Sequence, residues 1–188
     1  MPRAGINKQI VLQTAVEIAD SEGLDKLNLA SISQKLGIRT PSLYNHVDGL
    51  EGLKILLTVH GMNQLESEIA QAAIGKSKDE AMRSISQAYL AFARKHPGLY
   101  KATQYVNDFQ DDRIRQASDR IVDLVSKVVS AYNLKHENAI HVIRMFRSLL
   151  HGFATIENTG GFGIPLDVDD SFDLSLTIFL KGIHSMYL

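Results

Sequence analysis

The stretch that decides the fold is residues 27–53, which read LNLASISQKLGIRTPSLYNHVDGLEGL. Asn28 is a natural N-cap for a short helix, which Gly37 ends. The apolar side of this helix carries three residues at helical spacing: Leu29, Ile32 and Leu36. A second short helix opens at Thr40-Pro41, where Thr40 can cap it and Pro41 takes the tolerated first position. The short turn between two such helices predicts a helix-turn-helix.

The rest of the chain shows helical spacing of apolar residues almost throughout, with no convincing strand pattern. A first helix closes at Gly23, and its last turns lead into the stretch quoted above. The expected later helices cover about residues 48–74, 79–95, 111–131, 136–158 and 169–186. We therefore expect an all-α protein. Three helices form an N-terminal helix-turn-helix domain at 1–52, and a fourth helix joins it to a larger helical domain at 53–188.

The composition excludes several classes of protein. With 20 basic and 21 acidic residues the formal charge is -1, so any contact with DNA must be local. No cysteine is available for a disulfide, a thiolate metal site or a nucleophile. The start of the chain lacks the apolar segment of a signal peptide, and no apolar run approaches the roughly 18 residues of a membrane span. These features indicate a soluble, cytoplasmic protein with no membrane partner.

The helix-turn-helix leaves a polar set of side chains facing outward once its apolar residues face the core. The set mixes donors and acceptors that suit base edges and phosphates in a major groove. Its members are Arg39, Thr40, Ser42, Tyr44, Asn45 and His46, and Pro41 from the same stretch completes the candidate DNA-binding residues. A second interpretation stays open on spacing alone, because two short helices with a glycine turn occur in many helical bundles.

The same region resembles the DNA-binding domain of the TetR family of transcriptional regulators. The resemblance rests on Gly23-Leu24-Asp25, Leu29-Ala30-Ser31-Ile32, Leu36-Gly37-Ile38 and the run from Thr40 to Val47. It implies three DNA-binding helices, a connecting fourth helix, and a larger domain that dimerises and binds a small-molecule effector. It further implies a ligand-responsive repressor that binds a palindromic double-stranded DNA operator as a homodimer.

The resemblance also assigns roles within the outward set. It implies phosphate contacts for Tyr44 and His46 and base contacts for Ser42 and Asn45, although Tyr44 is alternatively a partly buried packing residue. Family members often place a lysine early in the fourth helix, whereas the matching position here is Leu50. The backbone amides and dipole of that helix N-terminus would then supply the phosphate contact.

The C-terminal part resembles a TetR subgroup that carries a Trp-His-Gly signature. The match consists of residues 96–100 (HPGLY), 150–153 (LHGF) and 160–163 (GGFG), with Leu150 in place of the tryptophan. In this family the last two long helices of each subunit form a four-helix interface. The implied dimer contacts are Phe153, Phe172, Leu176, Phe179 and Ile183. The alternative is that these residues only fill the core of one subunit.

An effector pocket is expected between the connecting helix and the helices that follow it. Its candidate lining residues are Met62, Tyr89, Phe92, Tyr100, Phe109, Met145, Phe146, Arg147 and His151. Aromatic and methionine side chains at helical spacing also serve as ordinary core, and His151 is alternatively a core histidine with its hydrogen bonds satisfied.

An enzyme is not expected, because the sequence has no phosphate-binding glycine loop after a strand, no His-Glu-x-x-His and no nucleophile motif. We expect no cofactor and no metal site, since the seven histidines lack an acidic partner at ligand spacing. The alternative to a DNA-binding regulator is a helical interaction or scaffold protein whose helix-turn-helix is non-functional.

Overall fold

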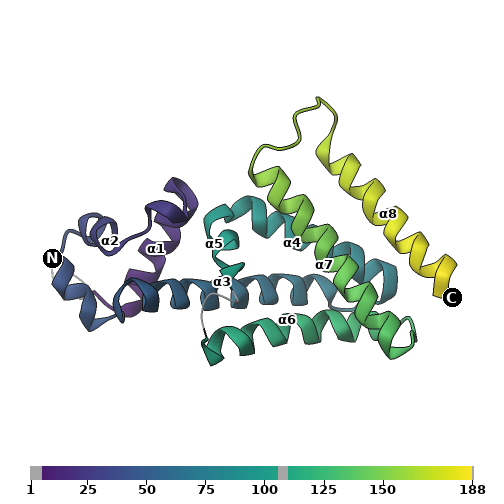
Figure 1. Cartoon of the computed structure of the whole chain (residues 1–188), viewed down its shortest axis with the longest axis horizontal. Helices are drawn as coiled ribbons and strands as arrows, with labels where there is room; N and C mark the ends of the chain where they lie inside the picture. The colour runs from purple at the N-terminus through teal and green to yellow at the C-terminus, as the bar shows by residue number, and fades with distance from the viewer. Residues whose placement is uncertain (1–5, 106–109, 188) are drawn as a thin grey trace. The chain divides into compact units, whose positions relative to one another are not determined.

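The computed structural model describes residues 6–105 and 110–187 (Figure 1). In chain order its elements are α1 (Lys8–Glu22), the 3-10 helix η1 (Leu24–Lys26), α2 (Leu29–Leu36), the 3-10 helix η2 (Thr40–Asn45), α3 (Gly49–Ala73), α4 (Lys78–Lys95), α5 (Pro97–Ala102), α6 (Asp112–Ser130), α7 (His136–Asn158) and α8 (Val168–Tyr187). No strand occurs within these described ranges. The expectation of an all-α fold is confirmed.

The chain folds into two compact units, each built from segments that are far apart in the sequence. Unit 1 comprises residues 1–64 and 96–118, and unit 2 comprises residues 65–95 and 119–188. Unit 1 therefore contains the helix-turn-helix, the first part of α3 and the short helix α5. The division of function at residues 52 and 53 stays a prediction.

The core of unit 1 forms where α1 packs against α2, and α2 packs against η2. Full burial of one aliphatic side chain contributes about 1.5–3 kcal/mol, so a handful of such residues dominates the stability of this small region. The fully buried aliphatic side chains include Val11 and Ile18 of α1, Ile32 of α2, Leu43 of η2 and Leu53 and Leu57 of α3. Buried residues of α1, α2, η2 and α3 thus form the core that stabilises the helix-turn-helix.

Unit 2 has an aromatic layer between α7 and α8. The rings of Phe146 and Phe179 stack with centroids 5.8 Å apart, and Phe153 meets the edge of Phe172 at 4.9 Å. Such pairs contribute about 0.5–1.5 kcal/mol beyond the apolar area that they bury. These contacts fix α7 and α8 side by side through residues that lie about two turns apart on each helix.

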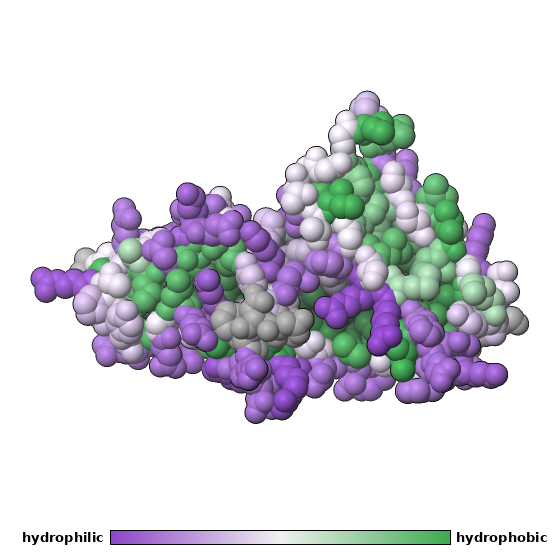
Figure 2. Space-filling view, in the orientation of Figure 1, coloured by the Kyte–Doolittle hydropathy of each residue, from purple (hydrophilic) through white to green (hydrophobic). Residues whose placement is uncertain are grey.

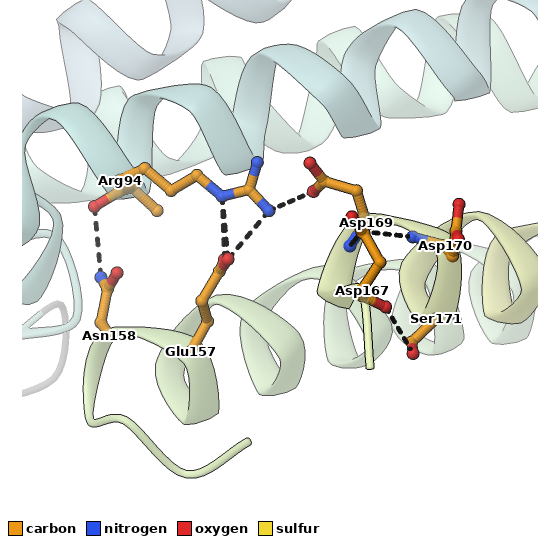
Figure 3. Close-up of polar contacts among 8 residues, drawn as sticks. Arg94, Glu157, Asn158, Asp167, Asp169, Asp170 and Ser171 are labelled. Atoms are coloured by element: carbon orange, nitrogen blue, oxygen red, sulfur yellow. Dashed lines mark hydrogen bonds and ion pairs between the residues drawn. The ribbon is translucent and has the colours of Figure 1, made fainter. Parts of the chain in front are cut away.

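Polar contacts secure α4 at both of its ends in unit 2. Near its end, the Arg94 guanidinium donates to Glu157 of α7, with Nε 3.0 Å from the carboxylate, and also to Asp169 of α8 (Figure 3). These hydrogen bonds raise the pKa of Arg94. Near its start, Asp79 accepts a hydrogen bond of 2.7 Å from the Tyr132 hydroxyl and lies 2.9 Å from His184 Nε2. Both ends of α8 are thereby linked to α4.

Two half-buried histidines, His60 on α3 and His151 on α7, have pKa values below the ordinary 6.5. Burial disfavours the charged ring in both, and the charges of His96 and Arg147 respectively add to this effect. The unfolded chain therefore binds these protons at a higher pH than the folded chain does. Both groups lower the free energy of unfolding as the pH falls below 6.5.

We predict that replacing His60 reduces the loss of folding stability that occurs as the pH falls. Thermal unfolding followed by circular dichroism between about pH 7 and about pH 5 should show a smaller fall in Tm for His60→Gln than for the wild type. His136→Gln, on the exposed first turn of α7, is the matched control and should keep the wild-type slope. Equal slopes for His60→Gln and the wild type would contradict the prediction.

Candidate nucleic-acid interface

The first helix of the motif, α2, has well-defined ends. Asn28 caps it as predicted, because its Oδ1 accepts a hydrogen bond of 2.9 Å from the Ser31 amide. The Ser31 hydroxyl accepts in return from the Asn28 amide at 3.1 Å, which completes a capping box. Gly37 ends the helix with φ of 66°, in the left-handed region that favours glycine. These two ends fix where the following turn begins.

The second helix of the motif differs from the prediction at its start. Arg39, not Thr40, takes the N-cap position, and η2 begins there as a 3-10 helix with Pro41 in its first turn. The Thr40 and Ser33 hydroxyl oxygens lie 2.9 Å apart. Because the single Ser33 proton is already donated to the Ala30 carbonyl, Thr40 is the donor in this pair. Thr40 thus ties η2 to α2 instead of capping it.

The outer face of η2 is polar and open to solvent, as the sequence predicts. Four candidate residues are exposed together with Arg39 at its N-cap: Pro41, Ser42, Tyr44 and Asn45. Thr40 and His46 are half-buried. Tyr44 is 61% exposed, which favours the outward role over the alternative of a partly buried packing residue. Leu43, between Ser42 and Tyr44, is fully buried and holds this face in place.

The start of α3 carries a cation that the sequence interpretation passed over. Leu50 is half-buried at the position where the family often has lysine, and Lys54 follows four residues later. Residues four apart lie on the same face of a helix, so Lys54 shares the face of Leu50 one turn along. This spacing was the available signal, and it adds Lys54 to the candidate phosphate contacts.

The described candidate effector residues are divided between the two units, with Met62 and Tyr100 in unit 1 and the others in unit 2. Met145 is 60% exposed and Arg147 is exposed, on either side of the buried Phe146 of α7. Their role in effector binding stays a prediction. Four others are buried side chains, and Tyr89 and His151 are half-buried. The buried four are Met62, Phe92, Tyr100 and Phe146. Phe109 lies outside the described residues.

A shallow hollow on the surface of unit 2 is lined by other residues than these candidates. It has a volume of about 320 Å³ and lies between the ends of α3 and α6. Its walls are mostly apolar, with two lysines among them: Ala70, Ala73, Ile74, Lys76, Ser77, Leu124, Lys127, Val128 and Ala131.

The predicted dimer contacts belong to the core of one subunit. Phe172, Leu176 and Ile183 are buried within unit 2, while Phe153 and Phe179 are half-buried in the aromatic layer. On α8, Phe172, Leu176 and Ile183 share one helical face, and this face is buried within unit 2. The opposite face of α8 exposes Leu174 and Ile178, each 62% exposed. Figure 2 shows hydrophobic side chains reaching the surface along α8 and on the connection before it.

The described residues contain no group of three histidine, aspartate or glutamate side chains placed to hold a metal ion. Among these residues there is also no helix with the length and apolar character needed to cross a membrane.

Comparison with known proteins identifies the family. The family model described as "Tetracyclin repressor-like, C-terminal domain" matches residues 82–179. The chain is 37% identical to the "Uncharacterized HTH-type transcriptional regulator YobS" of Bacillus subtilis (strain 168) over 97% of this chain and 95% of that relative. The chain belongs to the TetR family of transcriptional regulators. It is therefore similar over its whole length to DNA-binding regulators, and TetR-family proteins of this kind are not enzymes.

Solved structures share the TetR fold at low sequence identity. A protein with unknown function from Rhodococcus sp. RHA1 superposes with a TM-score of 0.84 at 19% identity, covering 96% of this chain and 97% of that one. The TetR-Q116A protein of Acinetobacter baumannii AYE in complex with minocycline superposes with a TM-score of 0.74 at 12% identity, covering 98% and 99%. At such identities the likeness concerns the fold alone.

We predict a large loss of stability at one residue of η2 and almost none at its neighbour. Leu43→Ala should lower the free energy of unfolding by about 2–5 kcal/mol, because it leaves a cavity at a fully buried position. Tyr44→Ala should change it by no more than about 0.5 kcal/mol, because that side chain is mostly exposed. Urea unfolding of both variants measures the difference, and a large loss for Tyr44→Ala would show that this ring has a packing role.

Proposed function

We propose that this TetR-family regulator is a homodimeric, ligand-responsive repressor whose η2 helices read a palindromic operator. The observation that carries the proposal is the outer face of η2, where exposed Ser42, Tyr44 and Asn45 surround the fully buried anchor Leu43. Tyr44 is 61% exposed, so most of its ring is available for a contact outside the chain. These groups match the contacts expected in a major groove, with Ser42 and Asn45 toward base edges and Tyr44 toward phosphate.

Phosphate contacts would come from few charges, because the chain has no excess of basic residues. Arg39 at the start of η2, Lys54 and the first amides of α3, and the half-buried His46 are the groups that we assign to this role. Lys35, by contrast, lies 3.3 Å from Glu17 and is already paired. A small number of phosphate contacts makes the two half-sites of a dimer important for affinity.

The second copy of the chain is assigned to the outer faces of α7 and α8. Leu174 and Ile178 of α8 lie four residues apart, and Met145 and Ile156 of α7 lie eleven residues apart, so each pair shares a helical face. All four are exposed, which is unusual for apolar side chains on adjacent helices of a soluble domain. This assignment replaces the buried residues predicted from the sequence.

Repression and effector release remain the proposed mode of regulation. The family model that matches this chain is named after the tetracyclin repressor, and one structural neighbour was solved in complex with minocycline. A small molecule that prefers one conformation of the dimer would shift the population away from the DNA-bound form. A helical scaffold protein with a non-functional helix-turn-helix is the alternative.

Selection from a random DNA pool tests DNA binding directly. The purified full-length protein should enrich a palindrome with half-sites about one helical turn apart. Asn45→Ala and Tyr44→Ala should each weaken binding to the enriched duplex by about tenfold, an effect of about 1.4 kcal/mol. Lys76→Ala, an exposed cation at the end of α3, is the control for loss of a surface side chain. Failure to enrich any sequence would favour the scaffold alternative.

Disrupting the exposed face of α8 should separate the subunits. We predict that Leu174→Lys combined with Ile178→Lys gives a folded monomer in analytical ultracentrifugation, because two buried charges would be placed in the interface. Ile74→Lys is the matched control, since Ile74 is 75% exposed and follows the end of α3, outside α7 and α8. This substitution should leave the dimer intact. An unchanged dimer in the double variant would place the interface elsewhere.

A further inference from the structure

Asp20, near the end of α1, uses both carboxylate oxygens to hold the start of α5. Its Oδ2 lies 2.8 Å from His96 Nδ1, and its Oδ1 accepts a hydrogen bond of 2.8 Å from the Leu99 amide. His96 is the N-cap of α5 but makes no side-chain cap bond of its own. Asp20 therefore caps α5 from a different helix and satisfies an amide that the helix itself leaves unpaired.

The backbones of α1 and α5 touch at the same place. A Cβ built on Gly98 would lie only 1.9 Å from the Ala19 carbonyl oxygen, so only glycine permits this approach. The side chains of Asp20 and His96 are each only 18% exposed. A partly buried hydrogen bond beside a close backbone contact depends more on its exact geometry than a solvent-exposed ion pair does.

The opposite side of α5 is joined to α3. The fully buried Thr58 hydroxyl donates to the Ala102 carbonyl at 3.1 Å. A Cβ on Gly61 would lie within 3.0 Å of the Leu99 side chain, which shows how closely α3 and α5 pack. Gln64 Nε2 lies 3.4 Å from His96 Nε2. The helix α5 thus bridges α1 and α3, and His96 contacts both.

This bridge is a second connection between the helix-turn-helix and α3. The direct connection is the short segment after η2, which enters α3 at Gly49 with φ of 69°, a left-handed conformation that favours glycine. Because α1 packs on α2 and α2 on η2, the direction of η2 follows that of α1. The bridge through α5 therefore adds to the core packing of Leu53 and Leu57 in fixing η2 relative to the first part of α3.

We propose that Asp20 is a positioning residue that sets the operator spacing the dimer accepts. This inference rests on the proposed function. Asp20 touches no residue of the η2 surface in the described contacts; it acts by holding α5 against α1. Since α3 continues into unit 2, which carries the proposed dimer face, the angle between η2 and α3 determines which half-site separation both η2 helices reach.

The sign of the effect separates positioning from simple electrostatics. Removing an acidic residue from a DNA-binding unit lowers repulsion by phosphates and should strengthen binding to any DNA. Loss of positioning should instead weaken binding to the preferred operator. Asp25 is the matched control, because it also joins α5, through Lys101 Nζ at 3.2 Å, but its side chain is 83% exposed.

The experiment compares full-length wild type, Asp20→Ala, Asp20→Asn and Asp25→Ala on the enriched operator and on versions with one or two extra central base pairs. Measurements are made well below each Tm. We expect Asp20→Ala to bind the preferred operator about tenfold more weakly. It should also bind the lengthened operators with less penalty than the wild type shows. Asp20→Asn should fall between the two, because its amide oxygen still accepts from Leu99, and Asp25→Ala should match the wild type.

Two results would overturn the assignment. One is an equal loss of affinity by Asp20→Ala at every spacing, which indicates only a smaller folded fraction. The other is unchanged or stronger binding with the wild-type spacing preference. If Asp20→Ala does not fold, Asp20→Asn gives the test, through the ratio of its affinity for the preferred operator to its affinity for the lengthened operators. If the wild type binds no DNA, both the proposed function and this inference are wrong. If the wild type binds with a spacing preference, the proposed function stands and the Asp20 variants test this inference alone.

Discussion

The burial of Leu43 is the interaction on which the rest of this structure depends. A 3-10 helix of six residues has poor internal hydrogen bonds and is not stable alone in water. It persists because Leu43 is inserted into the core that α1 and α2 form, and because Thr40 is bonded to Ser33. The same inward anchor turns Ser42, Tyr44 and Asn45 outward. One apolar contact therefore supports both the fold of unit 1 and the surface to which DNA binding is assigned.

Much of unit 1 could be predicted because its signals are local in sequence. Asn28 and Gly37 mark the ends of α2 through capping and a left-handed turn, and both depend only on neighbouring residues. Thr40 was misassigned because its partner, Ser33, lies across the turn on another helix. Lys54 does not occupy the family's lysine position, and only the helical period, which places it on the face of Leu50, indicates it as a candidate phosphate contact.

Unit 2 was less predictable because periodicity shows that a helix has an apolar face without showing what covers it. For α8 the sequence indicated Phe172, Leu176 and Ile183 as one face. All three are buried within the chain, with Phe172 against Phe153 of α7. The exposed pair Leu174 and Ile178 on the opposite face was not separable from them by hydrophobicity. Contacts such as Asp20 with His96 join residues 76 positions apart, and nothing in local sequence indicates them.

The most direct test of DNA binding through η2 is the structure of the full-length protein bound to the DNA duplex that it selects. We expect η2 to lie in the major groove in both subunits of a dimer joined through α7 and α8. Ser42 and Asn45 should face base edges, and Tyr44 should contact a phosphate. A complex in which the DNA lies on another surface, or in which η2 faces away from it, would contradict the central claim.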